Sequence, residues 1–322
     1  MTAREYYYYK FQMRDNDRSM LLHIGRLLQQ FVGDIYIKIE TCRLDYCRKQ
    51  QNEVRIEILK GVIDSLSIGE TSGNRVGRKI ILPPSFIGGP RDMRRRYIDA
   101  MALVQKYGKP DYFLTMPCNT MWPEIQQNLK YEDKPQNRPD LLSRVFRSKL
   151  EMLKNELVNK HIFGEVAACV YVIEFQKRGL PYAHILLIMK PNYKPLNLEA
   201  YDKVMCAEIP DPSENFHLYS LVIKHMFHGP CGELKKNNIC MKNGTCKNHY
   251  PKPFADFITH SEDGYPHYRR RDNGRSVIVR LHELDNRWVV PYESFLLALF
   301  DCHLNVEVVK VEDNLRKSEL VD

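Results

Sequence analysis

The stretch VYVIEFQKRGLPYAHILLIM, at residues 170–189, constrains the fold more than any other part of this chain. Two apolar runs flank a short turn that contains Lys177, Arg178 and Gly179, and each run is long enough for one strand. The pattern therefore predicts an antiparallel hairpin over residues 168–189 with its turn centred near Gly179.

The second strand of this hairpin carries a candidate metal ligand. Side chains alternate between the two faces of a strand, so Tyr182 and His184 are expected on the same face. A turn centred near Gly179 sets Glu174 opposite His184 and Gln176 opposite Tyr182. Glu174, Gln176 and His184 could together hold a divalent cation such as Mg²⁺ or Mn²⁺. An ordinary ion pair between Glu174 and His184 explains the same residues without a metal, and the residue types leave both interpretations open.

The rest of the chain alternates predicted helices with short apolar strands. Strands separated by long helices predict an α+β fold with an antiparallel sheet. The clearest helix follows Pro139 and has a buried stripe of Leu142, Phe146, Leu150, Leu153 and Leu157. We predict a helical N-terminal region at 1–80, a main domain at 81–310 that contains a Cys/His-rich loop insertion at 225–254, and a divergent tail at 311–322.

Basic residues gather in three places, although the net charge of +8, from 48 Lys and Arg against 40 Asp and Glu, is modest. These places are RDMRRR at 91–96, the turn FQKRG, and YRRRDNGR at 268–275. Basic runs are often only solvated surface, but three of them beside candidate chemistry favour a polyanionic partner. The residues that we assign to that partner are Arg91, Arg95, Lys177, Arg178, Arg269 and Arg270.

A cluster of cysteines and histidines lies in HGPCGELKKNNICMKNGTC. His228, Cys231, Cys240 and Cys246 flank two turns, and four nitrogen and sulfur donors in a loop suit tetrahedral Zn²⁺. His225 or His249 could replace His228 as the fourth donor, and free cysteines in a half-buried loop are the alternative without a metal.

The cysteine pattern also bears on the cellular compartment. The chain has nine cysteines, and its first residues, MTAREYYYYK, lack the apolar core of a signal peptide. No apolar run approaches the roughly 20 residues that cross a bilayer. We therefore expect a reducing compartment, the nucleus or the cytosol, with no secretion and no membrane partner.

Seven segments, in one order along the chain, resemble the N-terminal part of Helitron transposon proteins. They are FIGGPRDMRRRYIDAMALVQKYGKPDYFLTM, KHIFGEVAACVYVIEFQKRGLPYAHILLIMKPNY, AEIPDPSEN, KHMFHGPCG, CMKNGTCKNHYPKPF, YRRRDNGRS and LDNRWVVPY. The resemblance implies the replication-initiator region of a rolling-circle transposase, with the fold of an HUH-type single-strand endonuclease. In that family two histidines on one strand face bind Mg²⁺ or Mn²⁺, and tyrosines attack a DNA phosphate. Single-stranded DNA is then the expected polyanion.

This chain departs from the family pattern where the chemistry is done. The motif that should begin with histidine reads Tyr182-Ala183-His184, and a neutral phenol, with a pKa of about 10, is a poor ligand for a divalent ion. The paired tyrosines expected after the strand at 302–311 are replaced by EDNLRKSELVD, and no GxxxxGK[ST] phosphate loop occurs.

We therefore expect a truncated, degenerate transposase fragment that keeps some affinity for single-stranded DNA but neither nicks DNA nor hydrolyses ATP. One alternative is a weak metal-dependent endonuclease that uses Glu174, Gln176, His184 and water. Another is a non-catalytic partner of full-length Helitron transposase, or a pseudogene product.

Overall fold

The computed structural model describes residues 1–12, 20–51, 81–131, 133–176, 179–195, 201–202, 204–260 and 266–309. The chain divides into two compact units. The first contains residues 1–103 and 130–140, and the second contains residues 104–129 and 141–322. The predicted tail at 311–322 and the part of the predicted helical region after residue 51 lie outside the described residues.

The first unit is built from helices, as the sequence predicted for the N-terminal region. Its elements are α1 (Ala3–Lys10), η1 (Met20–His23), α2 (Arg26–Lys49), most of α5 (Pro90–Tyr107) and η4 (Pro135–Asn137). Helix α1 begins with a capping box in which the side chains of Thr2 and Glu5 each accept a hydrogen bond from the other residue's backbone N–H. Helix α2 presents a buried side to its neighbours, and Leu28 on that side has no exposed surface.

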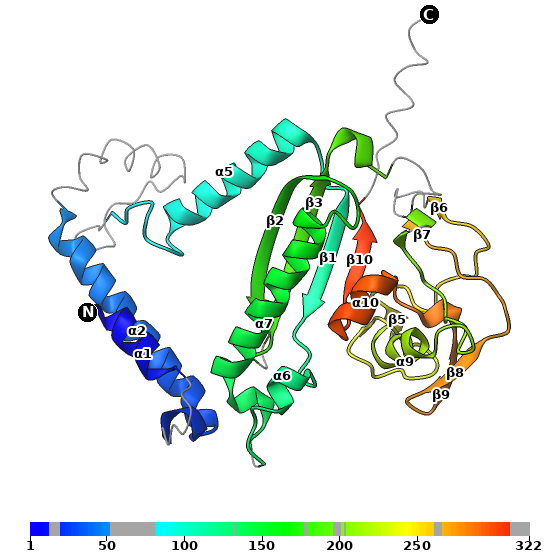
Figure 1. The fold of residues 1–322 in the computed structure, drawn as a ribbon, viewed down its shortest axis with the longest axis horizontal. Coiled ribbons are helices and arrows are strands. Elements are labelled where there is room, and N and C mark those ends of the chain that lie inside the picture. The colour runs from blue at the N-terminus through cyan, green and yellow to red at the C-terminus, as the bar shows by residue number, and fades with distance from the viewer. Residues whose placement is uncertain are drawn as a thin grey trace, which may run out of the picture. The chain divides into compact units, whose positions relative to one another are not determined.

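The second unit contains a four-stranded sheet whose neighbouring strands are all antiparallel, which confirms the predicted α+β class. In spatial order its strands are β10 (Asn305–Val308), β1 (Tyr112–Pro117), β3 (Pro181–Met189) and β2 (Val166–Phe175). Strands β2 and β3 form the predicted hairpin, whereas β1 and β10 come from distant parts of the sequence and pair side by side (Figure 1).

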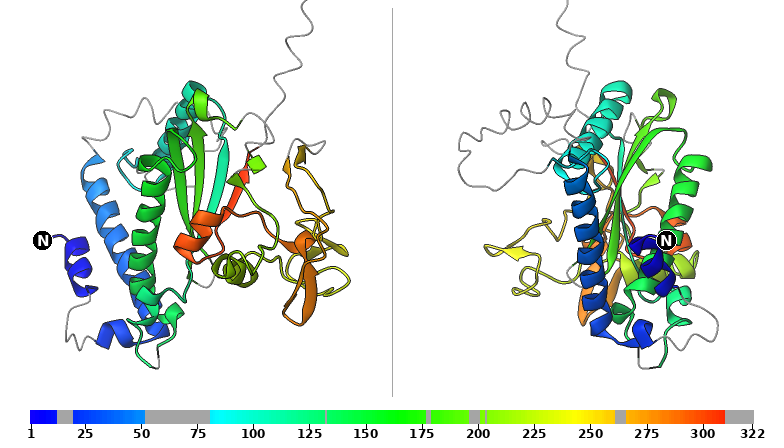
Figure 2. Two further views of the ribbon diagram at one scale, coloured as in Figure 1. Left: turned by 45° about the vertical axis from the view of Figure 1, so that its right-hand side comes forward. Right: turned by 90° about the vertical axis from the view of Figure 1, so that its left-hand side faces the viewer.

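Helix α7 (Pro139–Lys154) covers one face of this sheet, as the right-hand view of Figure 2 shows. Its apolar stripe is buried along its whole length and continues into the π-helical turn η5 (Asn155–Asn159), as predicted. Alternate side chains of β3, namely Ala183, Ile185 and Leu187, meet this stripe and have no exposed surface. Tyr182, His184 and Leu186 therefore lie on the opposite face of the sheet.

A second, smaller core lies between β3 and β10 in the sequence and packs beside the β10 edge of the sheet (Figure 1). It combines helices α9 (Phe216–His225) and α10 (Ser294–Phe300) with the hairpins β4–β5 (Met241–Lys242 and Thr245–Cys246) and β8–β9 (Ser276–Val279 and His282–Asp285). The short strands β6 (Thr259–His260) and β7 (Pro266–His267), the short helix α6 (Pro123–Gln126) and the 3-10 turns η6 (Pro191–Tyr193) and η7 (Asn286–Trp288) complete the unit.

None of the helices in the described parts of the chain combines the length and the apolar character that a membrane crossing needs.

Candidate functional site

The hairpin register differs from the predicted one by two residues. Glu174 pairs with Tyr182, and Val172 rather than Glu174 pairs with His184. The loop is centred one residue earlier than Gly179, and Gln176 accepts a hydrogen bond from the backbone N–H of Gly179. Because a shift of two residues preserves the face of every side chain, Glu174, Tyr182 and His184 still share one face.

His184 is held by three neighbours on this face. Its Nδ1 lies 3.2 Å from the hydroxyl of Thr115 on β1, and its Nε2 lies 3.7 Å from a carboxylate oxygen of Glu174. The ring stacks on Phe113 with 5.7 Å between the ring centres. Gln176 lies in the loop and is exposed, and the described residues form no group of three or more His, Cys, Asp or Glu ligands here. Glu174 and His184 thus lie at the distance of the pair that was the alternative to a divalent site.

The Cys/His segment forms a tight cluster of potential metal ligands. One ligand atom from each of His228, Cys231, Cys240 and Cys246 lies within 4.8 Å of every other. Bonds of about 2.3 Å from Zn²⁺ to sulfur place tetrahedral ligand atoms roughly 3.8 Å apart. A small movement of these four ligand atoms towards one another would therefore let them bind one Zn²⁺ tetrahedrally. His228 is the fourth donor of the cluster, because the Nε2 of His225 instead contacts Asp301 at 2.6 Å.

Local structure explains why four residues spread over 19 positions meet. The backbone N–H of His228 donates to the carbonyl of Trp288, which fixes the loop after α9. Asn243 and Gly244 both have positive φ angles, 52° and 79°, and form the tight turn that joins β4 to β5. This turn pairs Met241 with Cys246 and so carries Cys240 and Cys246 to the same end of the hairpin.

The three thiols respond to one another. Burial, together with the nearby thiols of Cys246 and Cys240, raises the pKa of Cys231 to about 12. Burial also acts to raise the pKa of Cys246, but hydrogen bonds from the backbone of Tyr250 and Asn248 outweigh burial and leave this pKa lowered. Without a cation the thiol of Cys246 therefore ionises at a lower pH than the thiol of Cys231, whereas a bound Zn²⁺ would deprotonate all three cysteines.

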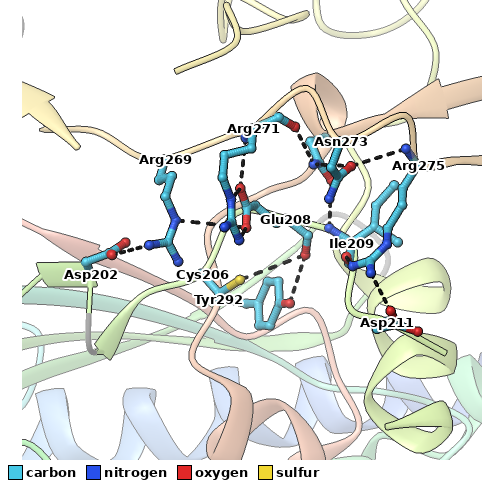
Figure 3. Close-up of polar contacts among 11 residues, drawn as sticks. Asp202, Cys206, Glu208, Ile209, Asp211, Arg269, Arg271, Asn273, Arg275 and Tyr292 are labelled. Carbon is cyan, nitrogen blue, oxygen red and sulfur yellow. Dashed lines mark hydrogen bonds and ion pairs between the residues drawn. The ribbon is translucent and has the colours of Figure 1, made fainter. Parts of the chain in front are cut away.

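Three arginines of the basic stretch 268–275 are engaged by acidic side chains, as Figure 3 shows. Arg269 pairs with Asp202, and Arg275 pairs with Asp211. Arg271 donates from its backbone and its guanidinium to the buried carboxylate of Glu208, with a closest contact of 2.7 Å. These arginines hold the segment against Asp202, Glu208 and Asp211, which precede α9 in the sequence.

Arg270 points the other way and is 4% exposed. Its Nη1 and Nη2 each donate to a backbone carbonyl at 3.2 Å, those of Tyr268 and Val289, and its buried Nε has no hydrogen-bond partner. No carboxylate lies within ion-pair distance of Arg270 in the described part of the chain. Of the two residues of this stretch assigned to a polyanion, Arg269 therefore has a structural ion pair and Arg270 does not.

Arg270 lines a pocket of about 1030 Å³ within the second unit. The pocket runs from Tyr182 on β3 and Glu307 on β10 to the loops around the Cys/His cluster, and Glu307 is the one acidic residue among the described residues that line it. Its basic lining residues are Lys224, His225, His228, Lys247, His249, Lys252, His267, Arg270, Arg280 and His303. Sequence reasoning missed most of them because they are scattered over 80 positions and form no run.

Tyr292, the last tyrosine of the chain, is buried at 1% exposure in the second core. Its hydroxyl donates to the backbone carbonyl of Glu208 at 2.9 Å, as Figure 3 shows, and burial raises its pKa. This hydroxyl therefore cannot reach a bound phosphate.

The remaining predicted polyanion contacts lie elsewhere. Arg91 is half-buried in the first turn of α5, and Arg95 pairs with the buried carboxylate of Asp92 at 2.8 Å. Arg96 pairs with the same carboxylate at 3.0 Å, so Asp92 neutralises part of this basic run. Lys177 and Arg178 lie outside the described residues.

Comparison with known proteins agrees with this architecture. Residues 6–187 match the family model of the Helitron helicase-like domain at the N-terminus, which covers more than half of the chain. The chain therefore belongs to the Helitron helicase-like N-terminal domain family, a transposon-associated protein region. No curated protein matches it.

Proposed function

We propose that this Helitron domain binds single-stranded DNA without nicking it. The observation that carries the proposal is the ligand set on the open face of the sheet. The position where the resemblance implies the leading histidine of the HUH motif is Tyr182, and the remaining imidazole, His184, is paired with Glu174 and Thr115.

This ligand set is too small for the expected chemistry. A divalent cation that polarises a phosphate needs several oxygen or nitrogen ligands fixed around it. One imidazole and one exposed carboxylate offer two, and Tyr182 adds a neutral phenol. An ion held this weakly would leave the phosphodiester without the electrophilic activation on which transfer to a tyrosine depends.

We also propose that the Cys/His cluster binds a structural Zn²⁺. The four donor atoms converge, and Cys231 and Cys246 are buried in the second core. Since the surrounding segment has only two-residue strands, metal binding would supply folding free energy that apolar burial there does not. All four ligands come from protein side chains, which is the pattern of a structural rather than a catalytic zinc site.

A nicking and binding experiment tests the proposed function. Labelled single-stranded DNA is incubated with the protein and Mn²⁺, and products are resolved both by length and as covalent protein–DNA adducts. We expect binding that weakens steeply with salt, and no cleavage. Cleavage that is lost in His184→Ala would refute the inactive reading.

The same assay separates the rival functions. Metal-dependent cleavage with no covalent adduct would indicate hydrolysis by water at Glu174 and His184. Absence of DNA binding at moderate salt would favour a role as a partner of full-length transposase.

A further inference from the structure

Arg270, which lines the pocket, carries a positive charge that is costly to bury in these surroundings. The guanidinium is 4% exposed, its two terminal nitrogens donate to the backbone carbonyls of Tyr268 and Val289, its other side-chain contact is the phenol of Tyr250, and its Nε is buried without a partner. Charges that are buried in proteins normally have a counter-charge, because desolvation of an ion costs several kcal/mol. Among the described residues no carboxylate contacts Arg270, and a bound anion would supply the counter-charge.

The neighbouring side chains leave that positive charge largely uncompensated. Lys252 lines the same pocket, with its Nζ 5.3 Å from the ring centre of Tyr250, and makes no ion pair within the described segments. Lys247 and Arg280 likewise lack carboxylate partners there. Glu307, the single acidic residue among the described lining residues, accepts a hydrogen bond from Asn305 at 2.7 Å. The net field in the pocket therefore favours an anion.

Arg280 reaches the pocket through a backbone arrangement that ordinary residues avoid. Arg280 and Leu281 both have positive φ angles, 50° and 70°, at the tip of the β8–β9 hairpin. The guanidinium of Arg280 lies against Gly229, where a Cβ would stand 2.0 Å from Nη1. This turn has an unfavourable backbone conformation and positions the guanidinium of Arg280 against Gly229. Proteins retain such backbone strain mainly at functional sites.

The chemistry of the lining identifies the ligand class. Planar guanidinium groups bind phosphate oxygens through paired N–H donors, and lysine supplies a point charge. The ring of Tyr182 also lines the pocket and offers a face on which an unpaired base can stack, whereas the ring of Tyr250 is already stacked on His228. A volume of about 1030 Å³ exceeds the need of a single phosphate and is large enough for a nucleotide with its neighbouring phosphates.

We propose that this pocket is a phosphate-binding site that holds the backbone of single-stranded DNA through Arg270, Arg280 and Lys252. The proposal deepens the proposed function and rests on it for the identity of the ligand. It places the bound strand at the β10 edge of the sheet, next to Tyr182, rather than along the arginine run of α5.

Two variants test the site without removing the buried Arg270. Arg280→Gln deletes one charge, and Gly229→Ala keeps every charge but displaces the guanidinium of Arg280, the flexible end of which can move without unfolding the protein. The matched control is Arg147→Gln, which removes an exposed arginine from α7, on the other face of the sheet. Melting temperatures confirm that all proteins are folded.

The readout is fluorescence anisotropy with a labelled oligonucleotide of about 15 residues, between about 50 and 200 mM salt. We expect both pocket variants to bind about fivefold or more weakly and the control to bind within about twofold of wild type. Arg280→Gln should also lower the slope of log affinity against log salt by about 0.7, the value for one contact to a single strand.

A second titration, with thymidine 5′-monophosphate followed by phosphorus NMR, separates the two proposals. Oligonucleotide binding that is equal in wild type, both pocket variants and control overturns the pocket site but leaves the proposed function standing. Mononucleotide binding that the pocket variants weaken, in a protein that does not bind the oligonucleotide, supports the phosphate site and overturns the proposed function. Binding of neither ligand overturns both.

Discussion

His228 Nε2 lies 3.4 Å from the sulfur of Cys246, within hydrogen-bond distance. With Cys231 and Cys240 beside them, the two side chains can enclose one tetrahedral cation. The cluster is part of the second core of the protein, because Cys231 and Cys246 are among the buried residues of that core.

We predict that protein expressed with zinc carries one equivalent, which elemental analysis can measure. Cys246→Ser should lose that equivalent and lower the melting temperature by at least about 5 °C, since each kcal/mol shifts the melting temperature of a domain of this size by about 2–4 °C. Cys42→Ser, which removes an exposed thiol, is the matched control and should change neither value. Full zinc content in Cys246→Ser would rule out this ligand set.

Tyr182→His should restore a second imidazole to the open face of the sheet. Because Tyr182 and His184 are two positions apart on β3, both rings would project from one face. We expect affinity for Mn²⁺, measured by electron paramagnetic resonance, to rise at least about tenfold over wild type. Tyr182→Phe removes the phenol without adding a ligand and should leave the affinity unchanged. Equal Mn²⁺ affinities in the two variants would mean that the rings do not converge on one ion.

Glu208 should make stability depend on pH in the acid range. Burial acts to raise the pKa of Glu208, but hydrogen bonds from the side chain and backbone of Arg271 outweigh burial and lower it. A carboxyl whose folded-state pKa is lowered contributes stability above its unfolded pKa of about 4.3, and this stability is lost as the pH falls through the folded-state pKa.

Glu208→Gln should therefore lose about 1–3 kcal/mol of unfolding free energy at neutral pH. The difference from wild type should shrink as the pH falls below about 4. Chemical denaturation at a series of pH values measures both effects. Glu151→Gln, which breaks an exposed ion pair on α7, is the control and should change stability by less than about 0.5 kcal/mol. A difference for Glu208→Gln that stays constant with pH would contradict the assignment.

Trp122 anchors the main core through its indole. The side chain is 1% exposed, and its Nε1–H donates to the carbonyl of Phe300 at 2.6 Å. Trp122→Phe should leave that carbonyl unpaired and cost about 1–3 kcal/mol beyond the loss of packing. Trp288→Phe provides the comparison, since Trp288 is 5% exposed and its indole has no hydrogen-bond partner among the described residues. Equal losses of unfolding free energy in the two variants, measured by urea denaturation, would show that the hydrogen bond from Trp122 to Phe300 contributes little to stability.

The strands and the main core could be predicted from the sequence, because the spacing of apolar residues that defines them is local. The apolar runs of 170–189 determine the β2–β3 hairpin, and the helical spacing of Leu142, Phe146 and Leu150 determines the buried side of α7. The register was wrong by two residues because the length of a loop is not encoded in the periodicity of its strands. The predicted face of each side chain was nevertheless correct, because side chains alternate between the faces of a strand with a period of two residues and the register error was also two residues.

The pocket could not be predicted in this way. Arg269 and Arg270 are adjacent and chemically identical, and their different roles follow from Asp202, which lies more than 60 positions away. An extended backbone indicates that the two side chains point in opposite directions. Only the tertiary fold shows which side holds the acids and which side opens into the pocket.

The placement of β10 has a consequence for how the protein is made. This strand pairs with β1, yet more than half of the chain separates the two in sequence. During synthesis the outer edge of β1 stays open until the ribosome has released the second core, and an open edge invites pairing with other nascent chains. Early folding of the metal-ligand segment would shorten the effective loop that β10 has to close, so zinc supply during translation should govern the yield of native protein.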